Sequence, residues 1–262
     1  MAVDPSNPYA APTAPVADVA SEAEAGRFVP GGRAVPSGNG WQWIVQGFAL
    51  FQLSPWIWIV NLVILLGIML VLAVLPIVGN VALNLLYPVF GAGLMLGCQA
   101  LTQGEPLEIA HLFAGFKDKT GDLVIVGLLY LVGVLAIAFV TALLAGLSMV
   151  NLLFSTRAMG SFNPTALLLA LLVMAALMIP LLMAVWFAPA LVVFHDVKPL
   201  EAMRQSFQGC LKNVVPFLVY GIIGLILGIL ATIPLGLGWL AWGPTAVASI
   251  YASYRDIFLE SA

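Results

Sequence analysis

The sequence predicts an all-α, polytopic membrane protein: a bundle of six transmembrane helices, three interfacial amphipathic helices and a threefold internal repeat. Three observations predict this fold class. Hydrophobic residues make up 62% of the 262 residues and charged residues only 8%, whereas soluble domains carry roughly 25% charged residues. Several apolar runs reach the roughly 20 residues that a membrane-crossing helix needs. Short amphipathic segments precede alternate runs, as is typical of helices that lie in the membrane interface.

Residues 1–40 are predicted to form a disordered tail. They are rich in Pro, Ala, Gly and small polar residues, and such a segment buries too little apolar surface to offset its chain entropy. Within this tail, Asn7, Pro8 and Tyr9 begin a compact cluster of turn-forming and aromatic residues. Ordinary tail sequence is the favoured interpretation of the cluster, and a short motif that docks a protein partner is the alternative.

Residues 41–256 are predicted to form the transmembrane domain, and residues 257–262 a short C-terminal tail. The predicted interfacial helices cover residues 41–53, 106–117 and 199–212, and the predicted spans cover residues 55–75, 81–101, 123–154, 165–194, 214–235 and 239–254. As helices, the third and fourth runs would each be about 45 Å long, against a hydrocarbon core of about 30 Å. They must therefore tilt, kink at Pro180 or Pro189, or project past the bilayer.

An internal repeat is suggested by matching positions along the chain. The tripeptide Pro-Leu-Glu begins at Pro106 and again at Pro199, and Lys119 and Lys212 each follow their proline by thirteen residues. Each even-numbered span also contains a proline flanked by small or aromatic residues, at Pro88, Pro189 and Pro244. We interpret the chain as three diverged copies of one unit, an interfacial helix followed by two spans. Chance matches between apolar runs are the alternative.

The basic residues predict the orientation. With six spans, eight of the nine lysines and arginines fall on one side of the membrane and only Arg157 falls on the other. The positive-inside rule then places both termini and all three interfacial helices in the cytoplasm. Cys98 and Cys210 lie near this reducing side, so neither is expected to form a disulfide.

The predicted spans contain no Asp, Glu, Lys or Arg, which argues against a proton-driven pump because such pumps need ionisable groups within the membrane. The two histidines, His111 and His195, have no metal-ligand spacing, and no nucleotide-binding or nucleophile motif occurs. We therefore expect no catalytic residues, no cofactor and no metal, and do not expect an enzyme. No basic patch large enough for nucleic acid is present.

Four basic residues are candidates for contact with anionic lipid headgroups, each worth on the order of 1 kcal/mol near the membrane surface. They are Lys117, Lys119, Arg204 and Lys212. Simple positive-inside anchoring would account for all four as well. Glycines such as Gly91, Gly93 and Gly97 are interpreted as close-packing positions between helices. Membrane lipids are thus the expected partners, and a homo-oligomer is compatible with the pattern.

The segments GWQWIVQGFALF, PVFGAGL, GEPLEIAHLFAGF and WFAPALVVFHDVKPLEAMRQSFQGCLKNVVPFLVYG carry a family resemblance. They resemble an uncharacterised family of multi-pass inner-membrane proteins of proteobacteria, which is similar to the membrane domain attached to some glycerophosphodiester phosphodiesterases. The resemblance covers roughly residues 40–256. It implies a six-helix integral membrane domain, and it assigns neither an activity nor catalytic residues.

The functional hypothesis that follows is a non-enzymatic scaffold or accessory factor of the inner membrane. Amphipathic helices, small-residue packing faces and a disordered tail all favour it. A transporter or carrier of a neutral or lipidic substrate is the alternative, because prolines in the even-numbered spans and an internal repeat are features of transporters. An intramembrane enzyme ranks last, since no paired acid, base or nucleophile lies at membrane depth.

Overall fold

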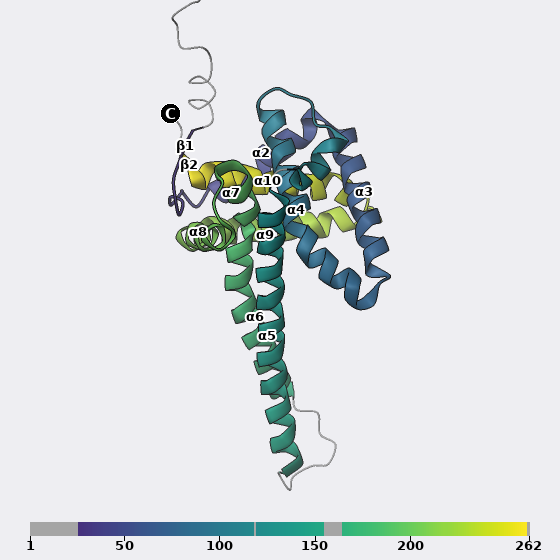
Figure 1. Cartoon of the computed structure of the whole chain (residues 1–262), viewed down its shortest axis with the longest axis vertical. Helices are drawn as coiled ribbons and strands as arrows, with labels where there is room; N and C mark the ends of the chain where they lie inside the picture. Colours follow the sequence, from purple (N-terminus) through teal and green to yellow (C-terminus); the bar gives the residue numbers. More distant parts are fainter. Residues whose placement is uncertain (1–25, 118, 155–163, 261–262) are drawn as a thin grey trace, which may run out of the picture.

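The computed structural model describes residues 26–117, 119–154 and 164–260, with the backbone alone for residues 145–154 and 164–167 (Figure 1). Its elements in chain order are β1 (Arg27–Phe28), α2 (Asn39–Leu53), α3 (Pro55–Ala73), α4 (Pro76–Thr102), the 3-10 helix η1 (Ile109–Phe116), α5 (Thr120–Phe154), α6 (Pro164–Trp186), α7 (Ala188–His195), α8 (Pro199–Lys212), α9 (Val214–Thr232), α10 (Trp239–Phe258) and β2 (Leu259–Glu260). The protein is all-α apart from the short β1–β2 pair.

Five helical segments of the described chain are long and apolar enough to cross a membrane: Pro55–Ala73, Pro76–Thr102, Thr120–Leu144, Leu168–His195 and Val214–Thr232. The predicted sixth span lies in α10, which does not meet the same criteria. The reason is the second half of α10, which carries serines, tyrosines, Arg255 and Asp256 and is largely buried within the protein. The prediction of six spans is therefore not confirmed.

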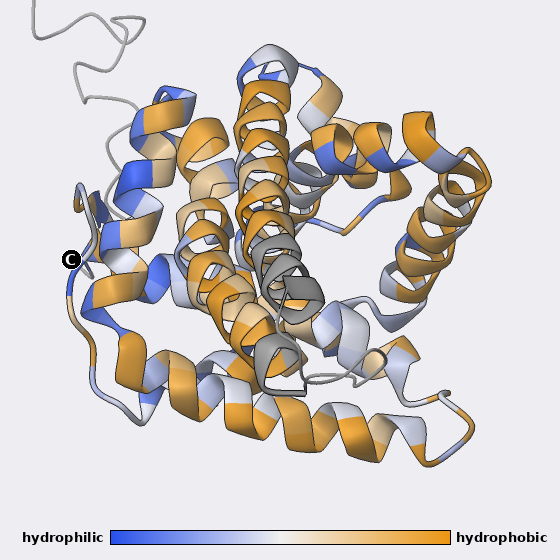
Figure 2. Ribbon diagram, turned by 90° about the horizontal axis from the view of Figure 1, so that it is seen from below, coloured by the Kyte–Doolittle hydropathy of each residue, from blue (hydrophilic) through white to orange (hydrophobic). Residues whose placement is uncertain are grey.

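The long helices form three hairpins, α3–α4, α5–α6 and α9–α10. Figure 1 shows α5 and α6 running side by side away from the rest of the molecule, with α9 and α10 lying across them. The exposed surfaces of these helices are apolar over most of their length (Figure 2). We predicted one bundle of spans, whereas the hairpins splay apart. One cause is that α9 packs against the amphipathic helix α2, where Gly40 permits close approach to the backbone at Pro216.

The fourth apolar run is broken near Pro189, one of the predicted ways of fitting it into a membrane. Helix α6 ends at Trp186 and α7 begins at Ala188. The hydroxyl group of Ser206 in α8 accepts a hydrogen bond from the Phe187 N–H (2.9 Å) and donates one to the Met183 carbonyl (2.7 Å). It thus replaces the direct bond that an unbroken helix would form between these two groups. The buried face of α8 is consequently more polar than its sequence pattern predicted, because it includes Ser206 and Gln205.

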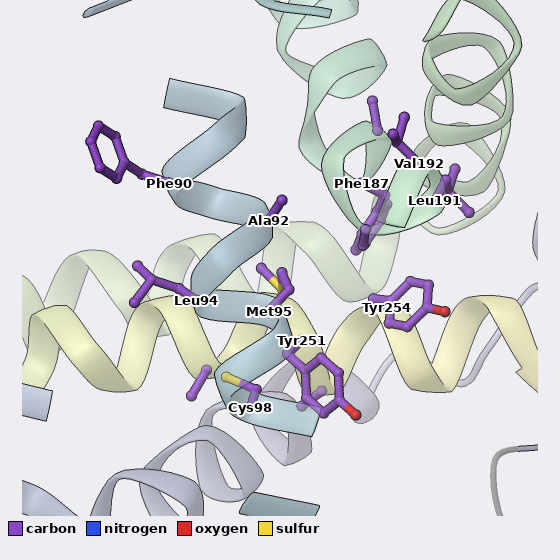
Figure 3. Packing of buried hydrophobic residues seen from close by; sticks show 14 of the residues in the cluster. Phe90, Ala92, Leu94, Met95, Cys98, Phe187, Leu191, Val192, Tyr251 and Tyr254 are labelled. Carbon is purple, nitrogen blue, oxygen red and sulfur yellow. The ribbon is translucent and has the colours of Figure 1, made fainter. Parts of the chain in front are cut away.

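The hydrophobic core forms where the second half of α4, the short helix α7 and the second half of α10 meet. Figure 3 shows this junction, with Met95 and Cys98 from α4, Leu191 from α7 and Tyr251 from α10. The prolines Pro88, Pro189 and Pro244 are all buried at the start of these three segments. The core therefore lies at one end of the molecule, while the parts of the hairpins near their turns remain largely exposed.

Each amphipathic element packs on the second arm of a different hairpin. Helix α2 packs on α10, η1 packs on α4, and α8 packs on α6 and α7. Glycines permit the close approach in two of these pairs. A Cβ atom at Gly47 would lie 2.6 Å from the Thr245 carbonyl oxygen, and one at Gly115 would approach the Val89 carbonyl oxygen. The first amphipathic helix thus contacts the last hairpin, which closes the arrangement into a ring.

The predicted disordered tail reached residue 40, but residues 26–40 are ordered in the structure. The Val29 N–H donates a 2.8 Å hydrogen bond to the Phe258 carbonyl, and the Val35 N–H donates one of 2.8 Å to the Asn213 side chain. Lys212 donates to the carbonyl groups of Gly31 and Gly32. These partners lie far away along the chain, so composition alone could not reveal them. Residues 1–25 lie outside the described part of the chain.

Candidate functional site

A polar hollow of about 770 Å³ opens where the C-terminal ends of α4 and α7 meet the end of α10. We call it the polar hollow, and its lining residues are Gly26, Gln99, Thr102, Gln103, Gly104, Glu105, Phe194, His195, Tyr251, Tyr254, Arg255 and Leu259. Its volume lies within the range of small-ligand pockets, about 300–1,000 Å³. Its lining is more polar than the linings of the three other cavities described below.

Side-chain contacts fix the floor of the polar hollow. His195 Nε2 lies 2.5 Å from the Tyr254 hydroxyl oxygen, and the His195 ring stacks on Phe28 at a centroid distance of 3.8 Å. The Thr102 and Tyr251 hydroxyl oxygens lie 3.3 Å apart. Figure 3 shows the hydroxyl groups of Tyr251 and Tyr254 pointing in the same direction from α10. The strand β1, through Phe28, thus helps to hold the histidine in place.

Two opposite charges line the polar hollow without contacting each other. Glu105 follows the end of α4 and Arg255 lies near the end of α10, and both side chains are exposed. Within the described residues, neither side chain forms an ion pair or a hydrogen bond. The neighbouring residue Asp256 points elsewhere, toward Arg33, Asn39 and Trp43. One cationic and one anionic group therefore remain available to a ligand in the hollow.

A second cavity of about 270 Å³ adjoins the polar hollow and shares Thr102, Tyr251 and Arg255 with it. We call it the α2–α10 groove, and its other lining residues are Gln46, Ala49, Leu50, Leu53 and Ala252. Leu53 is 62% exposed and lies at the end of α2, two residues before the apolar helix α3 begins at Pro55. The groove therefore leads from the polar hollow toward the first membrane-crossing helix.

An apolar crevice of about 350 Å³ lies between the α3–α4 and α5–α6 hairpins. Its lining residues are Met69, Leu83, Asn84, Tyr87, Tyr130, Leu182, Val185 and Trp186. A smaller cavity of about 130 Å³ shares Met69, Tyr87 and Trp186 with it and continues to α7 and α10. The crevice is formed by helices that are able to cross a membrane, and the described residues lining it carry no charge.

The four predicted headgroup residues do not form one site. Lys117 is exposed at the end of η1, and Lys119 forms an ion pair with Asp196. Arg204 is exposed and lies 3.5 Å from Glu201. Lys212 binds the backbone of Gly31 and Gly32, so its ammonium group serves the packing of the N-terminal segment.

His111 and Cys210 have structural roles, the first in helix capping and the second in core packing. Asn7, Pro8 and Tyr9 lie outside the described residues. His111 forms a capping box with Glu108 at the start of η1. Burial raises the pKa of the Cys210 thiol to about 12, so the thiol stays protonated at neutral pH. Among the residues that the structure describes, no three His, Cys, Asp or Glu side chains cluster as metal ligands do.

Comparison with known proteins places this membrane architecture in a family. No family model and no solved structure matches the sequence. The chain is 30% identical over 250 residues to the Probable inner membrane protein BTH_II0599 of Burkholderia thailandensis, in a match that covers 86% of this chain and 92% of that protein. The chain belongs to the family of this inner membrane protein. Together with five apolar helices, this makes it an integral, multi-pass protein of the inner membrane.

The residues of the polar hollow were missed at the level of sequence. Their positions carried a signal, because polar and aromatic residues follow each of the buried prolines: Gln99 and Thr102 after Pro88, His195 after Pro189, and Tyr251, Tyr254 and Arg255 after Pro244. Each group taken alone is typical of the polar end of a span. Only the meeting of the three helix ends in space shows that the groups line one hollow.

Proposed function

We propose that this protein is a non-enzymatic scaffold or accessory factor of the inner membrane. The observation that carries the proposal is the ring in which α2, η1 and α8 each pack on a different hairpin. A ring of this kind gives three lipid-embedded hairpins one common base, beside which the N-terminal segment is held by the β1–β2 pair. Such a base is suited to presenting a docking segment at the membrane. In this proposal the segment includes Asn7, Pro8 and Tyr9.

A carrier of a neutral or lipidic substrate is the second candidate. The apolar crevice favours it, because the crevice opens between two hairpins able to lie in the membrane and its lining is uncharged. Asn84 and the hydroxyl groups of Tyr87 and Tyr130 would supply a few polar contacts to a substrate there.

One experiment separates the two candidates. The full-length protein is extracted in native-lipid discs, and the molecules that accompany it are identified by mass spectrometry. We expect a stoichiometric protein partner that falls to background in Tyr9→Ala and persists in the control Thr13→Ala. Equal recovery of the partner with both variants would contradict docking through the tail. A specific lipid or metabolite without a protein partner would replace the scaffold proposal with the carrier.

We also propose that the chain is a threefold repeat that places both termini in the cytoplasm. Each unit would comprise one amphipathic element and the hairpin that follows it: α2 with α3–α4, η1 with α5–α6–α7, and α8 with α9–α10. Two features support this division. The amphipathic element of each unit packs on the preceding hairpin, with closure from the last to the first, and a buried proline begins the core segment of each second arm.

Labelling of single cysteines tests this topology. Leu235 is 97% exposed in the turn between α9 and α10, and Arg204 is exposed on α8. The native Cys98 and Cys210 are buried, so their background should be low. We expect a membrane-impermeant maleimide to label Leu235→Cys only from the periplasmic face and Arg204→Cys only from the cytoplasmic face. Reaction of both from the same face, or of Leu235→Cys from neither, would contradict the crossing by α9 that the six-span topology requires.

A further inference from the structure

We propose that the polar hollow and the α2–α10 groove together bind one zwitterionic phospholipid, with the headgroup in the hollow and an acyl chain in the groove. The two cavities share Thr102, Tyr251 and Arg255, so a ligand can occupy both at once. This site is independent of the scaffold role proposed above, since it needs neither the tail nor a protein partner.

The charges of the polar hollow select the headgroup. Arg255 presents a guanidinium group, which suits the two oxygens of a phosphate, and it lines both cavities. Glu105 lines the hollow but not the groove, and it would face a group beyond the phosphate. A carboxylate attracts an ammonium group and repels a second anion. A headgroup with a phosphate and a terminal ammonium therefore matches both charges, whereas a purely anionic headgroup satisfies only Arg255.

The helix ends add to this preference. The polar hollow lies at the C-terminal ends of α4 and α7, where the helix macrodipole favours a positive charge. The aromatic rings of Phe194, Tyr251 and Tyr254 pack together in the lining, and an ammonium group is attracted to such rings. The Tyr251 hydroxyl group can donate a hydrogen bond to a phosphate oxygen in exchange for its contact with Thr102, whose own hydroxyl group donates to the Gln99 carbonyl. The ammonium group and the phosphate group of the headgroup would thus each have partners in the polar hollow.

The α2–α10 groove favours a lipid over a soluble zwitterion. Its lining beyond the shared residues includes Ala49, Leu50 and Leu53, which offer apolar surface to a hydrocarbon chain. The exposed Leu53 adjoins α3, one of the helices able to cross a membrane. A chain lying in the groove would therefore pass directly into the bilayer, while the headgroup stays at the polar end of the protein.

Native mass spectrometry of the full-length protein in detergent tests the proposal. Short-chain phosphatidylethanolamine, short-chain phosphatidylglycerol and the soluble headgroup glycerophosphoethanolamine are titrated separately. We expect phosphatidylethanolamine to bind about fivefold or more tightly than phosphatidylglycerol, the effect expected of one well-placed charge near a membrane surface. Equal affinity for the two lipids would overturn the headgroup assignment. Equal affinity for phosphatidylethanolamine and the soluble headgroup would overturn the proposal that an acyl chain binds in the α2–α10 groove.

Two variants locate the site. Glu105→Gln should abolish the preference for phosphatidylethanolamine over phosphatidylglycerol, and Arg255→Gln should weaken both lipids about fivefold. Lys198→Gln, which removes an exposed lysine just before α8 and outside the polar hollow, is the matched control and should change neither affinity. Both test residues are exposed and unpaired among the described residues, so each variant should keep its unfolding midpoint. An unchanged lipid ratio in Glu105→Gln would overturn the proposal.

Discussion

Replacing Gly47 by leucine should separate α2 from α10 and lower the stability of the whole protein. A Cβ atom at this position would lie 2.6 Å from both the Ser249 backbone nitrogen and the Thr245 carbonyl oxygen. Both atoms belong to the backbone of α10, which cannot move aside as the end of a flexible side chain can. We expect a loss of about 3 kcal/mol or more from overpacking. The midpoint of thermal unfolding in detergent should fall by on the order of 10 °C.

The control for this change is Gly67→Ala in α3. A Cβ atom at Gly67 meets no other atom within 4 Å, and alanine is the better helix former by roughly 0.5–1 kcal/mol. We expect an unchanged or slightly raised midpoint for this variant. If Gly47→Leu unfolded at the same temperature as Gly67→Ala, the close approach of α2 to α10 would not hold, and with it the closure of the ring.

The long apolar helices could be predicted from the sequence because their signal is local. The predicted first, third and fifth spans correspond to α3, α5 and α9, with ends that differ by a few residues. A run of apolar residues without a charge is stable only where lipid surrounds it, and that preference depends on composition alone. The predicted sixth span was not confirmed because half of α10 is buried against other helices, and burial within the protein tolerates polar residues that lipid does not.

The elements that depend on distant partners could not be predicted. Residues 26–40 look like a flexible tail, yet their backbone groups bond to residues near 210 and 257. Ser206 looks like part of a polar face, yet it is buried because the break before Pro189 leaves backbone groups that need a partner. The polar hollow could not be predicted either, because its two charged residues come from the ends of α4 and α10, which lie far apart along the chain. Local sequence patterns were therefore sufficient to predict the long apolar helices, whereas the other features depend on long-range contacts that such patterns do not show.

Asp256→Ala should have the second largest effect, because this carboxylate joins the N-terminal segment and α2 to the end of α10. Its Oδ2 atom accepts hydrogen bonds from Asn39 Nδ2 (2.7 Å) and Trp43 Nε1 (2.8 Å), and its Oδ1 atom lies 3.5 Å from Arg33. Trp43 is fully buried, so its N–H would lose its partner without gaining water. An unsatisfied buried donor and a lost charge-assisted bond together cost about 3 kcal/mol.

Two measurements distinguish the contacts of the Asp256 carboxylate from an ordinary surface ion pair. The unfolding midpoint should fall clearly in Asp256→Ala but hardly at all in Arg204→Ala, which removes an exposed pair worth about 0–1 kcal/mol. Trypsin should also cleave after Arg33 faster in Asp256→Ala, because Arg33 then loses its ion pair and the segment before α2 is held by fewer bonds. If cleavage and midpoint both matched those of Arg204→Ala, the N-terminal segment would be held by its other bonds, to the backbone of residues 257 and 258 and to the side chains of Lys212 and Asn213. The Asp256 carboxylate would then not be needed to join the N-terminal segment and α2 to α10.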